Sequence, residues 1–303
     1  MASPQAEAAK AQMKALREAV TAAGDFQPTL EQQRDGILFM AEAATAPEGV
    51  TVSETYAGGC RAYWNDAPGG SKDHVVLYLH GGGYVIGSPK SHERLVGHIA
   101  KAAGCRVLNV DYRLAPEHPH PAAVTDATNA YSWLLGQGYR PERIVISGDS
   151  AGGGLTLATL LSLRDKGLPQ PAAAVPLSPW TDLEGTGDSM DSNAPNDFMV
   201  QRDGLQGMAA EFLGEANPRD PLAAPLYGDY HGIAPLYIQV GGDETLLDDS
   251  TRVAAKAQAD GCEVRIDIFP EMQHVFQVSV GNIPEATDAV QRMGVYIREK
   301  LGL

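Results

Sequence analysis

Short runs of apolar residues recur along the chain, and stretches with helical periodicity separate them. The later runs are nearly continuous in apolar residues, as expected for parallel strands that are covered on both faces. They span residues 74–80, 106–112, 143–147, 172–178, 236–242 and 263–269. Two earlier runs, 50–57 and 60–67, surround the turn residues Gly58 and Gly59 and predict an antiparallel hairpin at the start of the sheet.

Helical patterns fill the gaps between these runs, and several begin or end at proline or glycine. They span residues 91–103, 121–136, 151–166, 248–260 and 284–301. The regular alternation of strands and helices predicts an α/β fold with a mostly parallel, eight-stranded, doubly wound sheet.

Two segments interrupt this alternation. Residues 1–45 contain two helical patterns before any strand, and residues 184–217 separate two core strands. The second segment begins polar and then carries apolar residues at near-helical spacing. Long insertions in compact α/β domains often form lids or binding elements. Ordinary packing of the apolar stripe against the core is the alternative interpretation.

Composition narrows the function classes without identifying a substrate. A net charge of −15 argues against a nucleic-acid partner or an anionic membrane partner. The three cysteines are far apart and form no CxxC pair, which indicates neither a zinc site nor a disulfide framework. The first twenty residues lack an apolar leader, and no run of 18 apolar residues exists. We therefore expect a cytoplasmic protein without a membrane span.

The stretch "GDSAG" at 148–152 places Ser150 directly after a predicted strand and before a predicted helix. Gly148 and Gly152 lack Cβ atoms, so the strand and the helix can approach each other closely around a strained turn. A serine on such a turn lies at the carboxyl end of the sheet, where α/β proteins bind ligands. We expect Ser150 to be a nucleophile.

A serine nucleophile needs a general base and an acid, in the chain order serine, acid, histidine. His274 is the only histidine late in the chain, and it follows the last predicted strand, whereas the competing His231 precedes the strand that should supply the acid. Asp243 stands at the end of that strand. Asp248 and Asp249 start the next helix, where carboxylates are expected as caps. We therefore predict Asp243 as the acid that orients His274.

The stretch "LYLHGGGYVIG" supplies candidates for an oxyanion hole. It places consecutive glycines, including Gly81 and Gly82, just after a core strand, where backbone N–H groups can point at a developing negative oxygen. The N–H group of Ala151, the residue after the nucleophile, would be the third donor. A plain glycine-rich loop and a phosphate cradle are the alternatives.

Motifs for cofactors are incomplete. A dinucleotide fingerprint that starts at Gly81 and Gly83 needs a third glycine at position 86, which is Ile86. A zinc helix that starts at His92 needs a second histidine at position 96, which is Val96. No glycine–lysine pair exists, which excludes a P-loop. We therefore expect no metal and no organic cofactor.

With these motifs in this order, the chain resembles the bacterial hormone-sensitive-lipase-like (family IV) carboxylesterases of the α/β-hydrolase fold. The motifs that carry the resemblance are "HGGGY" (80–84), "DYRLAPEHPHPAA" (111–123), "GDSAGGGL" (148–155), "SPWTDL" (178–183), "GDETLLDDS" (242–250) and "QHVF" (273–276). The resemblance implies a helical cap built from residues 1–45 and 184–217, on a catalytic core built from residues 46–183 and 218–303.

The resemblance also implies residue roles. Ser150, Asp243 and His274 would form the triad. The oxyanion donors would be Gly81, Gly82 and Ala151. The chain departs from the family pattern at His120, where an aromatic residue is frequent. It departs again in the acid motif, which reads Asp-Glu-Thr in place of Asp-Pro-Leu and still keeps Asp243.

These features predict a serine carboxylesterase that hydrolyses short- to medium-chain acyl esters through an acyl-enzyme. The expected substrate-binding residues are apolar or aromatic, with core packing as the alternative for each: Tyr84, Phe198, Met208, Phe212 and Phe276. A receptor-like member of the same fold and an amidase are the alternative functions. The expected partner is a small ester substrate, and the resemblance also suggests a homodimer formed through a late edge strand such as 263–269.

Overall fold

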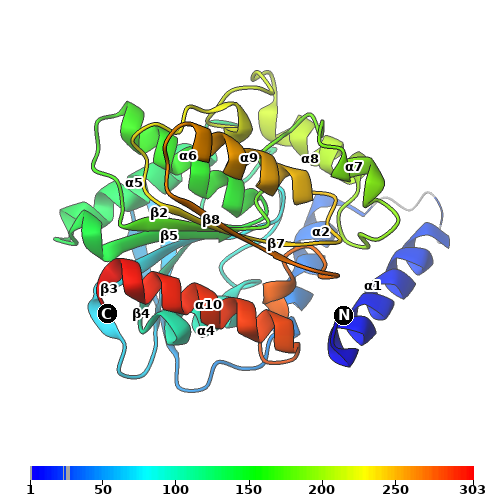
Figure 1. The fold of residues 1–303 in the computed structure, drawn as a ribbon, viewed down its shortest axis with the longest axis horizontal. Helices are drawn as coiled ribbons and strands as arrows, with labels where there is room; N and C mark the ends of the chain where they lie inside the picture. Colours follow the sequence, from blue (N-terminus) through cyan, green and yellow to red (C-terminus); the bar gives the residue numbers. More distant parts are fainter. Residues whose placement is uncertain (1, 23, 25–27) are drawn as a thin grey trace.

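The computed structural model describes residues 2–22, 24 and 28–303, and its centre is an eight-stranded sheet in the order β1-β2-β4-β3-β5-β6-β7-β8 (Figure 1). Strands β1 and β2 form an antiparallel hairpin, β2 pairs antiparallel with β4, and the other pairs are parallel. The predicted α/β fold is confirmed. The strands are β1 (Thr51–Ala57), β2 (Cys60–Asp66), β3 (Ser71–Leu79), β4 (Cys105–Val110), β5 (Ile144–Asp149), β6 (Ala173–Leu177), β7 (Leu236–Gly241) and β8 (Val264–Phe269).

Helices cover both faces of the sheet. In Figure 1, α5, α6 and α9 lie on one face, and α4 and α10 pack together on the other. The core helices are α4 (Glu93–Ala103), α5 (Ala122–Gly136), α6 (Ala151–Asp165), α9 (Leu247–Ala259) and α10 (Pro284–Leu301). Short 3₁₀ turns are η2 (Pro141–Arg143), η3 (Pro225–Tyr227) and η4 (Phe276–Ser279).

The central strand β5 shows why its sequence is continuously apolar. Ile144 and Ile146 belong to the core on the side of α5 and α6, whereas Val145 belongs to the core on the side of α4 and α10. Successive side chains of a strand point to opposite faces, so a strand covered on both sides needs apolar residues at every position. All of β5 is buried, and its last residue is Asp149, directly before Ser150.

The segments that interrupt the alternation are helical. Within 1–45 lie α1 (Pro4–Ala22), α2 (Leu30–Gly36), η1 (Ile37–Phe39) and α3 (Met40–Ala43), while residues 1, 23 and 25–27 lie outside the described residues. Within 184–217 lie α7 (Ser189–Ser192) and α8 (Arg202–Leu213). The division into a cap and a core stays a prediction at this point.

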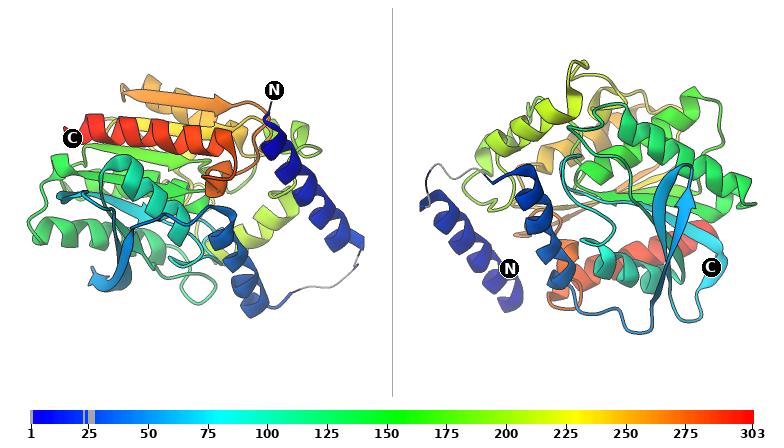
Figure 2. Two further views of the ribbon diagram at one scale, coloured as in Figure 1. Left: turned by 90° about the horizontal axis from the view of Figure 1, so that it is seen from below. Right: turned by 180° about the vertical axis from the view of Figure 1, so that it is seen from behind.

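Helix α1 lies along one side of the molecule, with its first turn beside the start of α10 (Figure 2). Ser3, just before α1, donates its backbone N–H and its hydroxyl group to the carboxylate of Glu285. Ala6 packs into a small apolar cluster that contains Met272 and Phe276, on either side of His274. Among the described residues, no helix is both long enough and apolar enough to cross a membrane.

Candidate active site

Ser150 occupies a strained turn between β5 and α6. Its backbone has φ 54° and ψ −120°, a conformation that costs a non-glycine residue about 1–3 kcal/mol. A Cβ atom at Gly148 would overlap the carbonyl oxygen of Gly152, and one at Gly152 would overlap that of Leu79. The predicted need for glycine on both sides of the serine is therefore confirmed. The N–H group of Ser150 donates to the carbonyl of Leu177 at 2.8 Å, which ties the turn to β6.

His274 lies in the loop after β8 and is buried. Its Nδ1 atom lies 2.7 Å from Oε2 of Glu244, which is fully buried. The other oxygen, Oε1, accepts hydrogen bonds from the hydroxyl group of Ser178 and from the N–H group of Gly241, both at 2.6 Å. Glu244 is thus held by donors from two neighbouring strand ends, with one oxygen left for the imidazole.

The predicted partnership between Asp243 and His274 is wrong. After β7 ends at Gly241, the chain turns so that the carboxylate of Asp243, which is partly buried, forms an ion pair with Lys10 of α1. Its own N–H group donates to the carbonyl of Met272. The sequence offers two adjacent carboxylates, and only the direction of this turn decides which one enters the site.

Glu244 and His274 shift each other's pKa. Burial raises the pKa of Glu244 above its ordinary value, although the charge of His274 and hydrogen bonds from Ser178 and Gly241 oppose this effect. Burial lowers the pKa of His274, but the charge of Glu244 and its hydrogen bond outweigh burial, so this pKa is raised. The imidazole is therefore prepared to accept a proton.

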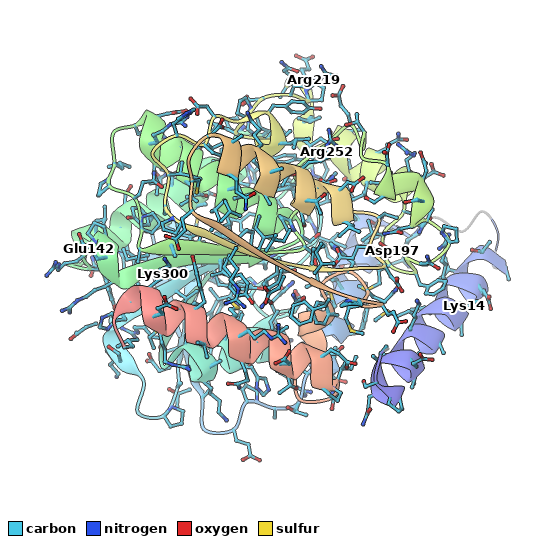
Figure 3. The ribbon with its side chains drawn as sticks, viewed as in Figure 1. Lys14, Glu142, Asp197, Arg219, Arg252 and Lys300 are labelled. Atoms are coloured by element: carbon cyan, nitrogen blue, oxygen red, sulfur yellow. The ribbon has the colours of Figure 1, made fainter. Side chains whose placement is uncertain are left out.

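The segment 184–217 supports the loop that carries Glu244. Asp197 belongs to the segment 184–217 and is buried (Figure 3). Its Oδ2 atom accepts hydrogen bonds from the backbone N–H group of Thr245 at 2.9 Å and from its hydroxyl group at 3.1 Å. Arg17 of α1 donates to the carbonyl of Asp197 at 2.8 Å. Residues 1–45 and 184–217 thus both support Thr245, the residue after Glu244.

Ser150 and His274 line one pocket with a volume of about 210 Å³. Its walls are mainly apolar and come from α3, α8 and the loops around the serine and the histidine. The apolar residues that line it include Ile37, Met40, Trp180, Leu205, Met208 and Val275. A hydroxyl group and an imidazole in such a pocket suit a small ligand with an apolar portion.

Of the predicted substrate-binding residues, Met208 lines this pocket. Tyr84 and Phe212 do not; their rings stack on each other 3.8 Å apart within the core. Phe198 lines a separate groove beside α1. Phe276 packs against Phe269 in the apolar cluster under α1.

Sequence reasoning missed Trp180 and Leu205 as pocket residues. Trp180 stands in the "SPWTDL" stretch just after β6, at the same edge of the sheet as the serine, which was an available signal. Leu205 belongs to the apolar stripe of the insertion, but spacing alone does not say which stripe residues face a pocket.

The oxyanion loop differs from the prediction at one glycine. The N–H group of Gly81 donates to Oδ1 of Asp149 at 3.1 Å, so the prediction of Gly81 as an oxyanion donor is wrong. Within the described part of the chain, the N–H groups of Gly82, Gly83 and Ala151 have no protein acceptor. Gly82 and Gly83 line the pocket, so Gly83 is a candidate donor that sequence reasoning missed.

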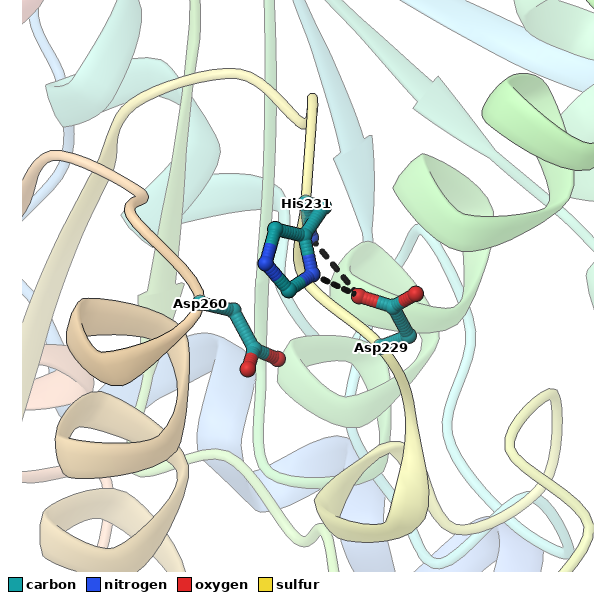
Figure 4. Close-up of side chains that lie close together, drawn as sticks. All are labelled: Asp229, His231 and Asp260. Carbon is teal, nitrogen blue, oxygen red and sulfur yellow. Dashed lines mark hydrogen bonds and ion pairs between the residues drawn. The ribbon is translucent and has the colours of Figure 1, made fainter.

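A group of potential metal ligands lies outside this pocket. Asp229, His231 and Asp260 bring their ligand atoms within 4.8 Å of one another (Figure 4). However, His231 pairs with Asp229 at 2.6 Å, and two cations lie near the carboxylates: Arg164 at 3.9 Å from Asp229, and Lys256 at 3.6 Å from Asp260. The group is a surface charge network, and His231 does not line the pocket as a competing base would.

Comparisons with known proteins agree with this fold. A family model described as the α/β hydrolase fold matches residues 76–278. An acetyl-hydrolase of Streptomyces hygroscopicus is 43% identical over 245 residues, which cover 81% of this chain and 82% of the relative. The crystal structure of an esterase from the bacterial hormone-sensitive lipase family is 44% identical, with a TM-score of 0.93 and 99% of each chain covered. An esterase/lipase structure from an uncultured bacterium is also 44% identical, with a TM-score of 0.93 over all of both chains.

Proposed function

Because the chain belongs to the bacterial hormone-sensitive-lipase-like esterases of the α/β-hydrolase fold, we propose that it is a serine carboxylesterase with the triad Ser150, His274 and Glu244. One observation carries this triad: Ser150 and His274 share a pocket, and Oε2 of Glu244 lies 2.7 Å from Nδ1 of His274. Because Nδ1 faces the carboxylate, Nε2 is the nitrogen that serves as the base.

The reaction proceeds in two halves. Ser150 Oγ attacks the ester carbonyl carbon while Nε2 of His274 takes the hydroxyl proton, and a tetrahedral oxyanion forms. The N–H groups of Gly82, Gly83 and Ala151 stabilise this oxyanion, and the loss of one such donor typically costs about 10²–10³ in rate. The imidazolium then protonates the departing alcohol, which leaves an acyl-serine.

The second half releases the acid. Water attacks the acyl carbon while Nε2 of His274 again accepts a proton, and collapse of the second oxyanion returns that proton to Ser150 Oγ. Glu244 stays ionised throughout, holds the imidazole in one orientation, and stabilises its positive charge. No step requires a metal or an organic cofactor.

The substrates are short- to medium-chain acyl esters. The pocket of about 210 Å³ is apolar and small, so it accommodates a short apolar chain beside the reacting carbonyl. Ile37 and Met40 come from residues 1–45, and Leu205 and Met208 come from residues 184–217. These two segments form the helical cap, and residues 46–183 and 218–303 form the catalytic core that carries the triad.

The test is pre-steady-state hydrolysis of p-nitrophenyl butyrate. We expect a burst of p-nitrophenol equal to the concentration of active serines, followed by slower turnover, and loss of both in Ser150→Ala. Saturable binding of the ester without turnover by the unmodified protein would instead indicate a receptor. Faster cleavage of butyryl p-nitroanilide than of the ester would indicate an amidase.

A further inference from the structure

A buried polar network that the proposed triad does not use lies directly behind the nucleophile. Its centre is Asp149, a residue that is 1% exposed. Oδ1 accepts hydrogen bonds from the hydroxyl group of Tyr78 at 2.7 Å and from the N–H group of Gly81 at 3.1 Å. Oδ2 lies 3.1 Å from Nε2 of His92, which is also buried.

The contacts of His92 fit an imidazolium ion. Its Nε2 atom faces the carboxylate of Asp149, and its Nδ1 atom lies 2.9 Å from the hydroxyl oxygen of Ser91. That hydroxyl group donates to the carbonyl of Ser88 at 2.8 Å, and the same carbonyl oxygen lies 3.4 Å from Nδ1. Both ring nitrogens thus face oxygen atoms that can accept a proton, as in an imidazolium ion. In agreement, burial lowers the pKa of His92, but the charge of Asp149 outweighs burial and raises it.

The network holds two successive peptide groups of the oxyanion loop. The first has its N–H group, from Gly81, bound to Asp149, and its carbonyl, from His80, bound to the hydroxyl group of Tyr112 at 2.6 Å. The second has its carbonyl, from Gly81, bound to Nδ1 of His80 at 2.8 Å. The C=O and N–H bonds of a trans peptide point in opposite directions, so this contact turns the N–H group of Gly82 away from His80.

We propose that Asp149, held as a carboxylate by the His92 imidazolium, is a positioning residue for the oxyanion loop. This inference rests on the proposed function. Asp149 precedes Ser150 in the chain, and its carboxylate accepts a hydrogen bond from the N–H group of Gly81. This one side chain therefore sets the distance between the nucleophile and the donors of the loop. Oxyanion donors act within a narrow range of distances. A displaced loop therefore stabilises the transition state less, while the binding of the ester in its ground state changes little.

The test compares Asp149→Ala with Asp149→Asn, with kcat expressed per titrated active serine. Alanine removes the acceptor for Gly81, and we expect kcat to fall about 10²-fold with little change in KM. Asparagine keeps an oxygen for Tyr78 and Gly81, and we expect its kcat to recover to within about tenfold of that of the unmodified enzyme. Asp126→Asn is the control, because Asp126 is another buried carboxylate, paired with Arg113 instead of with the loop.

The outcomes separate the possibilities. An alanine variant that is less stable but keeps its kcat per titrated serine overturns the proposal. An equal loss of kcat in Asp126→Asn also overturns it, because general destabilisation then explains the effect. If the unmodified protein shows no turnover, the proposed function itself is refuted. The protonation of His92 can still be measured in that case.

A second measurement does not depend on the folding of the alanine variant. A ¹⁵N NMR pH titration of the ring nitrogens of the unmodified protein should show that the pKa of His92 is raised above its ordinary value, and Asp149→Asn should lower that pKa. A pKa of His92 at or below its ordinary value in the unmodified protein overturns the proposal.

Discussion

Nδ1 of His274 lies 2.7 Å from Oε2 of Glu244, while the carboxylate of the preceding residue, Asp243, pairs with Lys10 on α1. Two adjacent acids therefore have different partners. Glu244 is buried with the imidazole, whereas the partly buried Asp243 contacts helix α1. This separation allows the two roles to be tested by the same chemical change at neighbouring positions.

Glu244→Gln should lower kcat/KM about 10⁴-fold, because an amide in place of the carboxylate fails to stabilise the imidazolium and favours the wrong tautomer of His274. Asp243→Asn is the matched control and should stay within about twofold of the unmodified enzyme, since Asp243 pairs with Lys10 instead of His274 and such a pair is worth up to about 1 kcal/mol. Steady-state kinetics with p-nitrophenyl butyrate measure both. A large loss in Asp243→Asn with a mild effect in Glu244→Gln would reverse the assignment of the acid.

The pH dependence of kcat/KM should report the ionisation of His274. The charge of Glu244 outweighs burial and raises the pKa of His274, and Asp197 and Asp149 act in the same direction. A protonated imidazole accepts no proton from the serine, so activity is lost as pH falls through this raised pKa. The residual activity of Glu244→Gln should show this acidic limb at lower pH, because the main raising charge is gone. An unchanged limb would mean that another group controls it.

Much of the fold was predictable because strands buried on both faces leave continuous apolar runs. The prediction of 143–147 and the observed β5 (Ile144–Asp149) show how closely such a run marks a strand. Ser150 was equally predictable, since its strained turn requires glycine at fixed positions on both sides.

The acid and the pocket walls were not predictable for a different physical reason. Whether Asp243 or Glu244 enters the site depends on hydrogen bonds from Ser178 and Gly241. Ser178 lies far from Glu244 in the sequence, and Gly241 donates through its backbone, so the sequence reveals neither contact. Similarly, the apolar stripe of α8 shows that the helix has a buried face. Spacing does not reveal that Phe212 stacks in the core while Leu205 meets the pocket.

The proposed preference for short acyl chains predicts a response to a side chain added at Gly204. This glycine lies on α8 at the pocket, and a Cβ atom built there meets open space. Gly204→Leu should lower kcat/KM for p-nitrophenyl octanoate relative to the acetate about tenfold, because the added side chain occupies the pocket. Gly207→Leu is the control: Gly207 is on the same helix, also has open space at its Cβ position, and does not line the pocket. Equal selectivity in the two variants would exclude α8 as a wall of the acyl site.

Helix α1 should loosen when its contact with the catalytic loop is removed. Lys10 pairs with Asp243, whereas Lys14, one turn further along, lies 4.0 Å from Glu18 on the same helix (Figure 3). Lys10→Ala should raise amide hydrogen exchange in α1 up to about fivefold, as expected for an ion pair worth up to about 1 kcal/mol. Lys14→Ala should leave exchange nearly unchanged. Equal exchange in both variants would show that other contacts, among them those of Ser3, Ala6 and Arg17, hold the helix without this ion pair.

The stability of the protein should depend on pH through Asp249, a buried carboxylate outside the triad. Its Oδ2 atom accepts hydrogen bonds from the N–H groups of Thr181 at 2.7 Å and Asp182 at 2.8 Å, yet burial raises its pKa from 3.8 to about 7. The native state therefore binds this proton more tightly than the unfolded chain does, and its contribution to the free energy of unfolding falls as pH rises from about 4 to 7.

Asp249→Asn should remove this contribution while an oxygen remains available for both N–H groups. Urea unfolding at pH 5 and pH 8 measures the change. The loss of stability between the two values should be smaller in the variant than in the unmodified protein, at about 1.4 kcal/mol for each unit of pKa shift that acts in this range. A variant with the same pH dependence as the unmodified protein would show that Asp249 is ionised in the fold, and that its two backbone donors outweigh the cost of burial.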